Sequence, residues 1–310
     1  MIEIINTFIN GLSLGGIYAM IALGYTMVYG IAKMLNFAHG DIIMVGGFTL
    51  FVTIGLLGNP LLAIIIAIII CGLLGVIMEK LAYKPLRGAS PLAVLITAIG
   101  VSYLLQSLAQ IIFGTGTKYV NMPNWGLISI GSLKIQVYTL VTLIASSIIM
   151  AVLSIFIKYS KTGRAMIAVS EDRAASELMG INVNTIITIT FLIGAMLAAV
   201  ASTFYLLKAP SISPTFGSMP GIKAFTAAVI GGIGSIPGAM IGGILLGVIE
   251  VFCNSVQVLA PYTDAIEFAI LILILLIRPT GLLGKKRMEK VWVKVILKNS
   301  SLRITLIILV

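Results

Sequence analysis

The sequence contains little charge. Asp, Glu, Lys and Arg make up 10% of its 310 residues, whereas 59% of the residues are hydrophobic. Soluble domains carry about 25% charged residues. A chain of this length with so few charges cannot build a surface that water solvates, so lipid must solvate much of it. The mean hydropathy of +1.15 agrees, and the composition excludes an ordinary soluble globular protein.

Cysteine and histidine are also scarce. The two cysteines, Cys71 and Cys253, lie in separate apolar runs, so their pattern indicates neither a disulfide framework nor a zinc site. We expect both to behave as small buried hydrophobic residues. His39 is the single histidine, which excludes a site with several histidine ligands. The sequence therefore predicts no metal site and no cofactor bound by this chain.

A phosphate-binding loop of the form GxxxxGK[ST] is absent from the sequence. The nearest segment, Gly281-Leu282-Leu283-Gly284-Lys285-Lys286, has the wrong spacing. The chain therefore has no recognisable ATP site of its own. If ATP drives its function, a partner must supply the ATPase.

Long apolar runs fill most of the chain. A membrane-spanning helix needs about 20 mostly apolar residues, and seven runs meet that length: 5–29, 37–57, 61–79, 91–113, 137–157, 185–207 and 262–278. Residues 219–258 form a further apolar region that Gly and Pro interrupt. We therefore expect an all-α polytopic membrane protein with about eight spans and short loops. One transmembrane domain would cover 1–284, and a basic tail would cover 285–310.

The basic residues predict the orientation of these spans. Sixteen of the 20 lie at Lys33, in the loops 80–90 and 158–184, and in the tail from Arg278 onward. The other four are Lys118, Lys134, Lys208 and Lys223. Because cytoplasmic loops are enriched in Lys and Arg, the first set is placed inside and the N-terminus outside. Residues 208–261 must then start and end outside, so this region crosses twice or dips in and returns.

The segment 231–238, Gly-Gly-Ile-Gly-Ser-Ile-Pro-Gly, interrupts the region 219–258. Both Gly and Pro break helices, so we expect a non-helical segment between two helical pieces. Irregular backbone at membrane depth survives where protein or a water-filled cavity satisfies it, and broken helices often mark a transport route. Gly232 and Gly234 are therefore candidate path residues. A tight hairpin between two short spans explains the segment equally well.

Polar residues recur along two of the predicted spans. Ser102, Gln106 and Gln110 share one helix face, and so do Glu250, Asn254 and Gln257. Asp264 and Glu267 begin the last span at the same predicted depth. Since an ionisable residue inside a span is a functional candidate, these side chains could line a path open to the outside. Hydrogen bonding between packed helices is the alternative.

A five-residue motif raises the possibility of an intramembrane serine hydrolase. Gly11-Leu12-Ser13-Leu14-Gly15 matches the GxSxG pattern of nucleophile turns, and His39 is the one available imidazole base. The motif lies inside an apolar span, however, where helix packing through small residues explains it. His39 follows Asn36, which we expect to cap the second span.

The loop 158–184 is the longest of those placed inside. Its residues 171–180, Glu-Asp-Arg-Ala-Ala-Ser-Glu-Leu-Met-Gly, contain good helix formers and end at Gly180, a natural helix stop. A short charged helix on the inner face suits docking to a soluble partner. A solvated surface helix is the alternative.

Five ordered motifs carry a family resemblance. They are GLSLGGIYAMIALGYTMVYGI (11–31), NFAHGDI (36–42), SEDRAASELMGI (170–181), GIKAFTAAVIGGIGSIPGAMIGGILLGVIE (221–250) and RPTGLLG (278–284). Together they resemble the membrane permeases of branched-chain amino acid ABC importers, and within these the H-type partner of the permease pair. The resemblance extends over nearly the whole chain.

The resemblance implies uptake of Leu, Ile and Val across a bacterial inner membrane. It also implies an extracytoplasmic binding protein, a second homologous permease and two ATPase subunits that use the ATP, with lipid around the chain and no nucleic acid. Relatives carry amides, urea, simple sugars or nucleosides. A self-sufficient secondary transporter or channel is a further alternative, because the chain has no ATP loop.

The loop 158–184 is similar to the coupling loop that ABC importers seat in a cleft of the ATPase. This similarity implies coupling roles for Arg164, Glu171, Asp172, Arg173, Ala174, Ala175 and Gly180. The motif departs from the commonest form, since Arg173-Ala174-Ala175 stands where many relatives have Glu-Ala-Ala.

Overall fold

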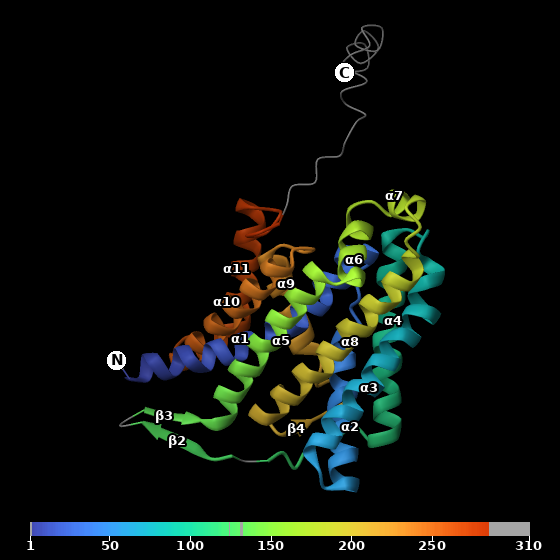
Figure 1. Ribbon diagram of the computed structural model, residues 1–310. Coiled ribbons are helices and arrows are strands. Elements are labelled where there is room, and N and C mark those ends of the chain that lie inside the picture. Colours follow the sequence, from blue (N-terminus) through green and yellow to red (C-terminus); the bar gives the residue numbers. More distant parts are fainter. Residues whose placement is uncertain (1, 124, 131–132, 285–310) are drawn as a thin grey trace.

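The computed structural model describes residues 2–123, 125–130 and 133–284 (Figure 1). Within them, eight helices are long and apolar enough to cross a membrane, which confirms a polytopic all-α membrane protein. Six of them are α1 (Ile2–Ala32), α2 (His39–Leu57), α4 (Pro91–Phe113), α5 (Val137–Tyr159), α8 (Val183–Lys208) and α10 (Ile236–Ser255). The seventh is α3 (Pro60–Met78), which continues through η1 (Glu79–Tyr83) and η2 (Lys84–Leu86), and the eighth is α11 (Thr263–Ile277), preceded by η3 (Ala260–Tyr262). The predicted tail 285–310 lies outside the described residues.

Shorter elements mark the two ends of the bundle. Helices α6 (Lys161–Glu171) and α7 (Arg173–Leu178) lie at one end, together with the last described residues of the chain (Figure 1). The strands β2 (Leu127–Ile130) and β3 (Leu133–Gln136) form an antiparallel ribbon at the other end, where β1 (Lys118–Tyr119) pairs with β4 (Ser211–Ile212). We call these the α7 end and the ribbon end. The sequence had not indicated the strands.

Local sequence explains where several spans begin and end. Asn59 and Ser90 cap α3 and α4, and a proline follows each cap at the first helical position. Gly58 ends α2 in a left-handed conformation with φ of 64°, which Gly adopts without steric cost. The expectation that Asn36 caps α2 was wrong. The helix starts at His39 without a side-chain cap, and the Asn36 side-chain oxygen instead accepts a hydrogen bond of 2.7 Å from the Tyr83 hydroxyl.

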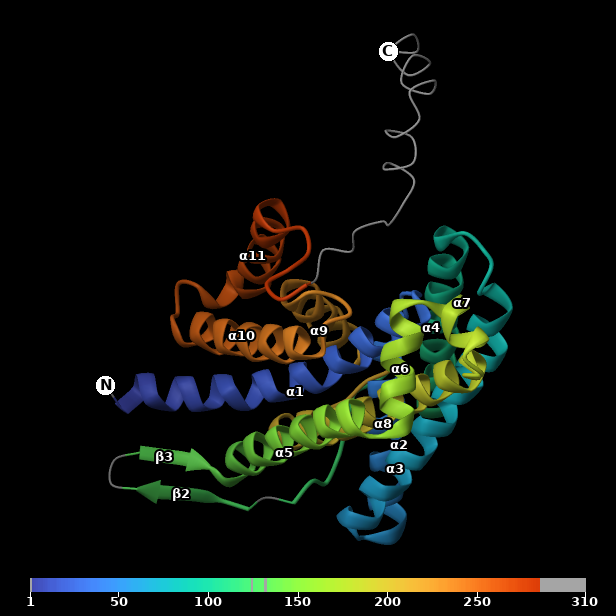
Figure 2. The same ribbon diagram turned by 45° about the horizontal axis from the view of Figure 1, so that its top comes forward.

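Helix α1 forms the centre of the bundle, since 94% of its most apolar window is buried. It runs beside α10 in the opposite direction (Figure 2). Gly243 of α10 lies against Ala19, and Gly247 lies against Gly15. A methyl group on either of these α10 glycines would overlap the α1 backbone. Without a hydrophobic drive in lipid, such close backbone approach is what allows helices to associate.

The region 219–258 folds as two helices, as expected from its glycines and Pro237. Helix α9 (Ser218–Gly231) and helix α10 pack against each other, with Gly238 against Gly231 and Gly242 against Ala227. Within the predicted break 231–238, only residues 232–235 are non-helical, so the break is narrower than predicted. Pro237 does not break a helix here, because it lies in the first turn of α10, where its missing N–H costs nothing.

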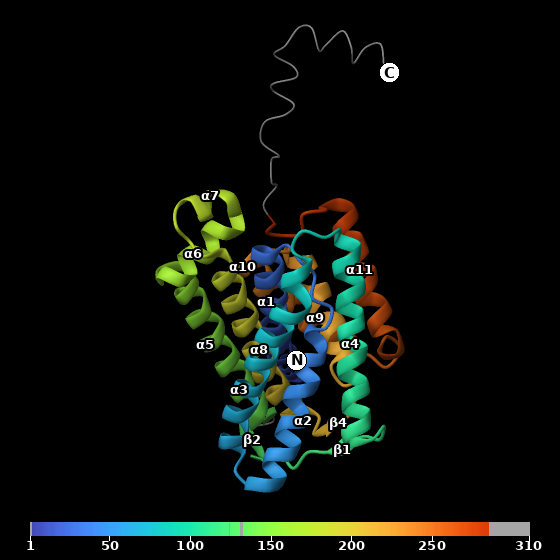
Figure 3. The same ribbon diagram turned by 90° about the vertical axis from the view of Figure 1, so that its right-hand side faces the viewer.

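Helix α9 has 14 residues and is too short to cross a bilayer alone. Its first turn lies beside the start of α2, where Gly217 contacts the Gly40 carbonyl. Its other end is covered by the chain after α11, since Leu282 and Leu283 donate backbone hydrogen bonds to the carbonyls of Ile230 and Gly231. Figure 3 shows the bundle from the side, with α6 and α7 at the top and the strands β1, β2 and β4 near the bottom. The chain from Ala209 to Gly231 thus combines an extended segment with a short helix.

Candidate transport and coupling sites

The predicted polar stripe of α4 meets a carboxylate of α2. Gln106 donates a hydrogen bond of 2.8 Å to Asp41 Oδ1, and its amide nitrogen also lies 3.2 Å from Ser102 Oγ and 3.5 Å from Ser218 Oγ. Asp41 is only 2% exposed. Three helices, α2, α4 and α9, therefore meet at one polar cluster, which we call the Asp41 cluster. Gln110, one turn further along α4, is exposed and lies outside it.

A second polar cluster surrounds Lys223 of α9. Its ammonium nitrogen lies 3.1 Å from Glu250, 2.8 Å from Asp264 and 3.3 Å from Glu267. Tyr18 of α1 donates a hydrogen bond of 2.6 Å to Glu250. Three carboxylates thus share one ammonium group. The Lys223 cluster joins α1, α9, α10 and α11, and its Glu267 side chain is fully buried.

The second predicted stripe divides in the structure. Glu250 belongs to the Lys223 cluster, whereas Asn254 accepts a 3.0 Å hydrogen bond from Thr263 at the start of α11. Gln257 lies beyond Ser255, the last residue of α10, and is exposed. It therefore does not continue the helical face of Glu250 and Asn254, contrary to our prediction. The sequence analysis assigned no role to Lys223. Its position in an apolar segment, with Glu250, Asp264 and Glu267 later in the chain, was the available signal.

The glycines proposed for a transport path lie in the turn between α9 and α10. Gly232 is buried, with φ of 109°, and a Cβ there would meet Gly284 and the Thr280 carbonyl. Gly234 is exposed, with φ of 90°, near Gly30 at the end of α1. Both positions require glycine, because other residues adopt this backbone only with strain. The turn lies at the α7 end, far along α10 from Glu250.

The predicted coupling segment forms helix α7 and the turns beside it. Asp172 caps the helix by accepting a 3.0 Å hydrogen bond from the Ala175 N–H. Gly180, with φ of 82°, ends it. Glu171, Ala174 and Ala175 are exposed, as is Arg164 on α6. Leu178 and Met179 are 89% and 82% exposed, so two large apolar side chains project from the tip of the molecule.

Arg173 differs from its neighbours, because it points into the protein. Its guanidinium donates a 3.0 Å hydrogen bond to the Ile31 carbonyl in the last turn of α1. Burial and the nearby Arg87 lower the pKa of Arg173, and Glu177 opposes this shift. Arg173 therefore connects α7 to the central helix, and its coupling role stays a prediction.

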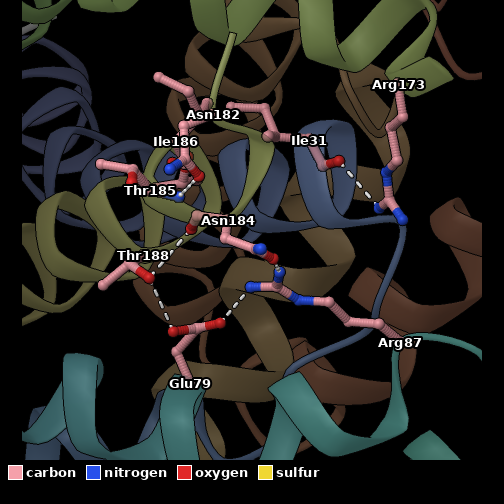
Figure 4. A network of polar contacts seen from close by, with 10 residues as sticks. Ile31, Glu79, Arg87, Arg173, Asn182, Asn184, Thr185, Ile186 and Thr188 are labelled. Carbon is pink, nitrogen blue, oxygen red and sulfur yellow. Dashed lines mark hydrogen bonds and ion pairs between the residues drawn. The ribbon is translucent and has the colours of Figure 1, made fainter. Parts of the chain in front are cut away.

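A second network lies below α7 and was not predicted (Figure 4). Glu79, whose side chain is fully buried, forms an ion pair with Arg87 and accepts a 2.8 Å hydrogen bond from Thr188. Arg87 also donates to Asn184. These contacts tie the end of α3 and the loop before α4 to the first turns of α8. The α7 end therefore carries two separate sets of polar contacts over the apolar bundle, one around Glu79 and one at Arg173.

The serine hydrolase alternative is not supported by the geometry. Ser13 and Gly24 both belong to α1, and the ring of His39 packs against Gly24. Eleven residues of helix separate the two positions by roughly 16 Å. The imidazole also makes an edge-on contact with Tyr25, with ring centroids 4.7 Å apart. His39 therefore cannot activate Ser13 in this arrangement.

Comparison with known families supports a transport role. The family model of the branched-chain amino acid transport system permease component matches residues 7–275. The chain belongs to this family. Permeases of this kind are transport subunits, and the eight apolar helices agree with a multi-pass membrane location.

Named permeases align with almost the whole chain. The high-affinity branched-chain amino acid transport system permease protein BraD of Pseudomonas aeruginosa is 44% identical over 91% of this chain and 96% of its own length. The permease LivH of Escherichia coli K12, of the same description, is 44% identical over the same shares. Among solved structures, PsaBC from Streptococcus pneumoniae in complex with Fab gives a TM-score of 0.48 at 18% identity, covering 95% of this chain and 94% of that chain.

Proposed function

We propose that the chain is a permease subunit of an ATP-driven importer for the branched-chain amino acids Leu, Ile and Val, in the bacterial inner membrane. The observation that carries this proposal is the 44% identity to permeases described by that substrate class over nearly their full length. The chain is then a transport subunit and not an enzyme. It binds no cofactor, and ATP is used by its partners.

The partners in this proposal are a second homologous permease, two ATPase subunits and an extracytoplasmic binding protein. Helix α7 supports an ATPase contact, because its tip exposes Leu178 and Met179 beside the acidic Glu171 and Glu177. A solvated helix has no need of two large apolar side chains at its tip. Exposed apolar residues with a charged rim are typical of protein-binding surfaces.

Arg173 and the Glu79 network would pass ATPase movement into the bundle. A closing ATPase can shift the permease only through contacts that differ between two states. The bond from Arg173 to Ile31 joins α7 to α1, and α1 is packed along α10. Motion at the α7 end would thereby reach the Lys223 cluster, since α10 carries Glu250 and α1 carries Tyr18.

The orientation follows from the same proposal. The α7 end would face the cytoplasm, and the ribbon end would face the binding protein. Lys118 and Lys134 lie on strands of the ribbon end, and Lys208 ends α8 on the same side. Residues 158–184 and the described segment after α11 lie at the α7 end (Figure 1), as the distribution of basic residues requires.

Reconstitution tests this function. The complete complex in proteoliposomes should accumulate labelled leucine only when ATP, the ATPase subunits and the binding protein are all present. Isoleucine and valine should compete, and ribose should not. Leucine accumulation by this chain alone would contradict the importer assignment, and ATP-dependent uptake of a sugar without leucine uptake would contradict the substrate.

A further inference from the structure

An apolar cavity of about 310 Å³ lies between α2, α3 and α4. Met44, Phe48 and Leu105 form its inner wall. Leu108 and Ile112 are 44% and 69% exposed, so the cavity opens at the surface of the bundle. Thr49 and Thr53 also line it, but their hydroxyls donate to the carbonyls of Val45 and Thr49 on their own helix, at 2.8 and 2.6 Å. The wall is therefore suited to an aliphatic group.

The Asp41 cluster lies about one helical turn beyond one end of the cavity wall, and its side chains do not line the cavity. Asp41 precedes Val45, a lining residue, by one turn of α2, and Gln106 follows the lining residue Leu105 on α4. The hydrogen bond between Asp41 and Gln106 joins the two helices at that point. A molecule whose aliphatic part fills the cavity would reach this polar cluster by extending about one helical turn along α2.

Asp41 is a buried carboxylate without a cation. The described residues show no ion pair to it, and the buried ammonium of Lys223 is held by three other carboxylates. Its side-chain partners, the Gln106 amide and the Ser102 hydroxyl, are neutral, and the start of α2, where Asp41 lies, supplies a partial positive charge. A carboxylate inside a membrane normally pairs with a cation or marks a substrate or ion pathway. The site thus lacks one positive charge.

A zwitterionic amino acid with a branched aliphatic side chain would provide a cation for the Asp41 cluster and an apolar group for the cavity. Its ammonium group complements Asp41, and its carboxylate complements the amide of Gln106, the Ser218 hydroxyl and the positive end of α9, as at other broken membrane helices. Its side chain matches the apolar cavity. No bond is made or broken in this step, and Gln106 gives up its contact with Asp41 as the ammonium enters.

We propose that Asp41, Gln106 and Ser218, together with the cavity between α2, α3 and α4, form a transient binding site for the transported amino acid within the permease. This inference rests on the proposed function. It adds that the permease itself selects for aliphatic side chains, in addition to any selection by the binding protein. Asp41 is the ammonium-binding residue, and the cavity sets the size limit.

Charge removal tests the polar part of the site, in the complete complex in proteoliposomes. We expect Asp41→Asn to lower leucine uptake at least 10-fold, while ATP hydrolysis stimulated by the leucine-loaded binding protein stays within about two-fold of wild type. Asp41→Glu should restore part of the uptake. Ser107→Ala, on an exposed position next to Gln106, is the control. Uptake by Asp41→Asn at the wild-type rate would overturn the proposal, and so would parallel loss of uptake and ATP hydrolysis with no recovery in Asp41→Glu.

Filling the cavity tests the apolar part. Ala109, which lines the cavity and is 6% exposed, is changed to Leu, and Ile111→Phe on the 79% exposed face of the same helix is the control. We expect the ratio of leucine to valine uptake to fall at least three-fold in Ala109→Leu alone. An unchanged ratio would overturn the proposal and leave the cavity to a lipid acyl chain. Failure of the wild-type complex to import any of the three amino acids would instead contradict the proposed function.

Discussion

At the scale of single residues, the charges at the α7 end are arranged around Glu79. This carboxylate is fully buried and depends on Arg87 for its counter-charge, whereas Thr188 contributes one neutral hydrogen bond. Removing one partner of a buried pair leaves an uncompensated charge, which costs more than the pair itself contributes.

Arg87→Ala should therefore destabilise the protein by roughly 3 kcal/mol, discounted somewhat because the Arg87 side chain is 16% exposed. The midpoint of thermal unfolding in nanodiscs measures this. Arg164→Ala, which removes the same charge from an exposed position on α6, should leave the midpoint unchanged. Equal midpoints for the two variants would show that the buried pair contributes little.

Lys223→Met should be more disruptive than Arg87→Ala. It leaves Glu250, Asp264 and Glu267 to repel one another in a site where Lys223 is only 9% exposed. We expect little folded protein after size-exclusion chromatography in mild detergent. The double variant Lys223→Met with Glu250→Gln should recover part of the yield, because one of the unpaired charges is gone. If the single variant folds normally, the cluster does not hold these helices together.

At the scale of elements, the pairing of α1 with α10 depends on glycine. In Gly247→Leu the new side chain must enter the backbone of α1 at Gly15. The cost should exceed the roughly 1–3 kcal/mol of ordinary overpacking, because backbone cannot rotate away. Gly100→Leu on α4 places the same side chain where nothing lies within 4 Å and should fold normally. If Gly247→Leu and Gly100→Leu gave comparable yields of monodisperse protein, the close packing of α1 on α10 would not depend on glycine.

Helix α7 gives a second prediction at this scale. Leu178→Asp places a charge on its most exposed apolar residue and should weaken ATPase docking by about 2 kcal/mol, the size of an interface hot spot. Uptake and stimulated ATP hydrolysis should then both fall at least 10-fold with unchanged membrane insertion. A bulky residue at exposed Ala175 should act similarly. Lys161→Ala, at the start of α6, should retain both uptake and ATP hydrolysis. If this variant lost them too, the effect would belong to the whole loop and not to the tip of α7.

The sequence predicted the positions of the helices better than it predicted the contacts between them. The apolar runs located every long helix, because length and hydropathy are local properties, and the glycines located the break before α10. Gln257 and Asn36 were misplaced because a helix end and a cap depend on tertiary partners, here Thr263 beyond α10 and Tyr83 on η1. Lys223 was overlooked because a single basic residue in an apolar run gives no signal until its carboxylate partners are placed.

At the scale of the whole molecule, the two ends differ in charge and in shape. The ribbon end carries β-strands and few basic residues, and the α7 end carries the polar contacts around Glu79 and Arg173. The predicted path residues Ser102, Gln106 and Glu250 lie between these ends, and their transport roles stay predictions. The helical fold could be predicted from the distribution of apolar and charged residues along the chain. The Asp41 and Lys223 clusters could not, because they form only when helices distant in sequence pack together.

Cysteine labelling in intact cells tests the orientation. Thr117→Cys, exposed near β1, should react with a membrane-impermeant maleimide, and Met179→Cys, exposed beside α7, should react only after permeabilisation. The native Cys71 and Cys253 are buried and should give little background. Labelling of Met179→Cys in sealed cells would reverse the topology.

The covering of α9 by Leu282 and Leu283 has a consequence for biogenesis. Helix α9 is too short to span a bilayer. The carbonyls of Ile230 and Gly231 at its end accept hydrogen bonds from Leu282 and Leu283, which are synthesised about fifty residues later. While α10 and α11 are being synthesised, the end of α9 therefore lacks these two hydrogen bonds. The end of α9 can therefore be covered only after the RPTGLLG segment has been synthesised.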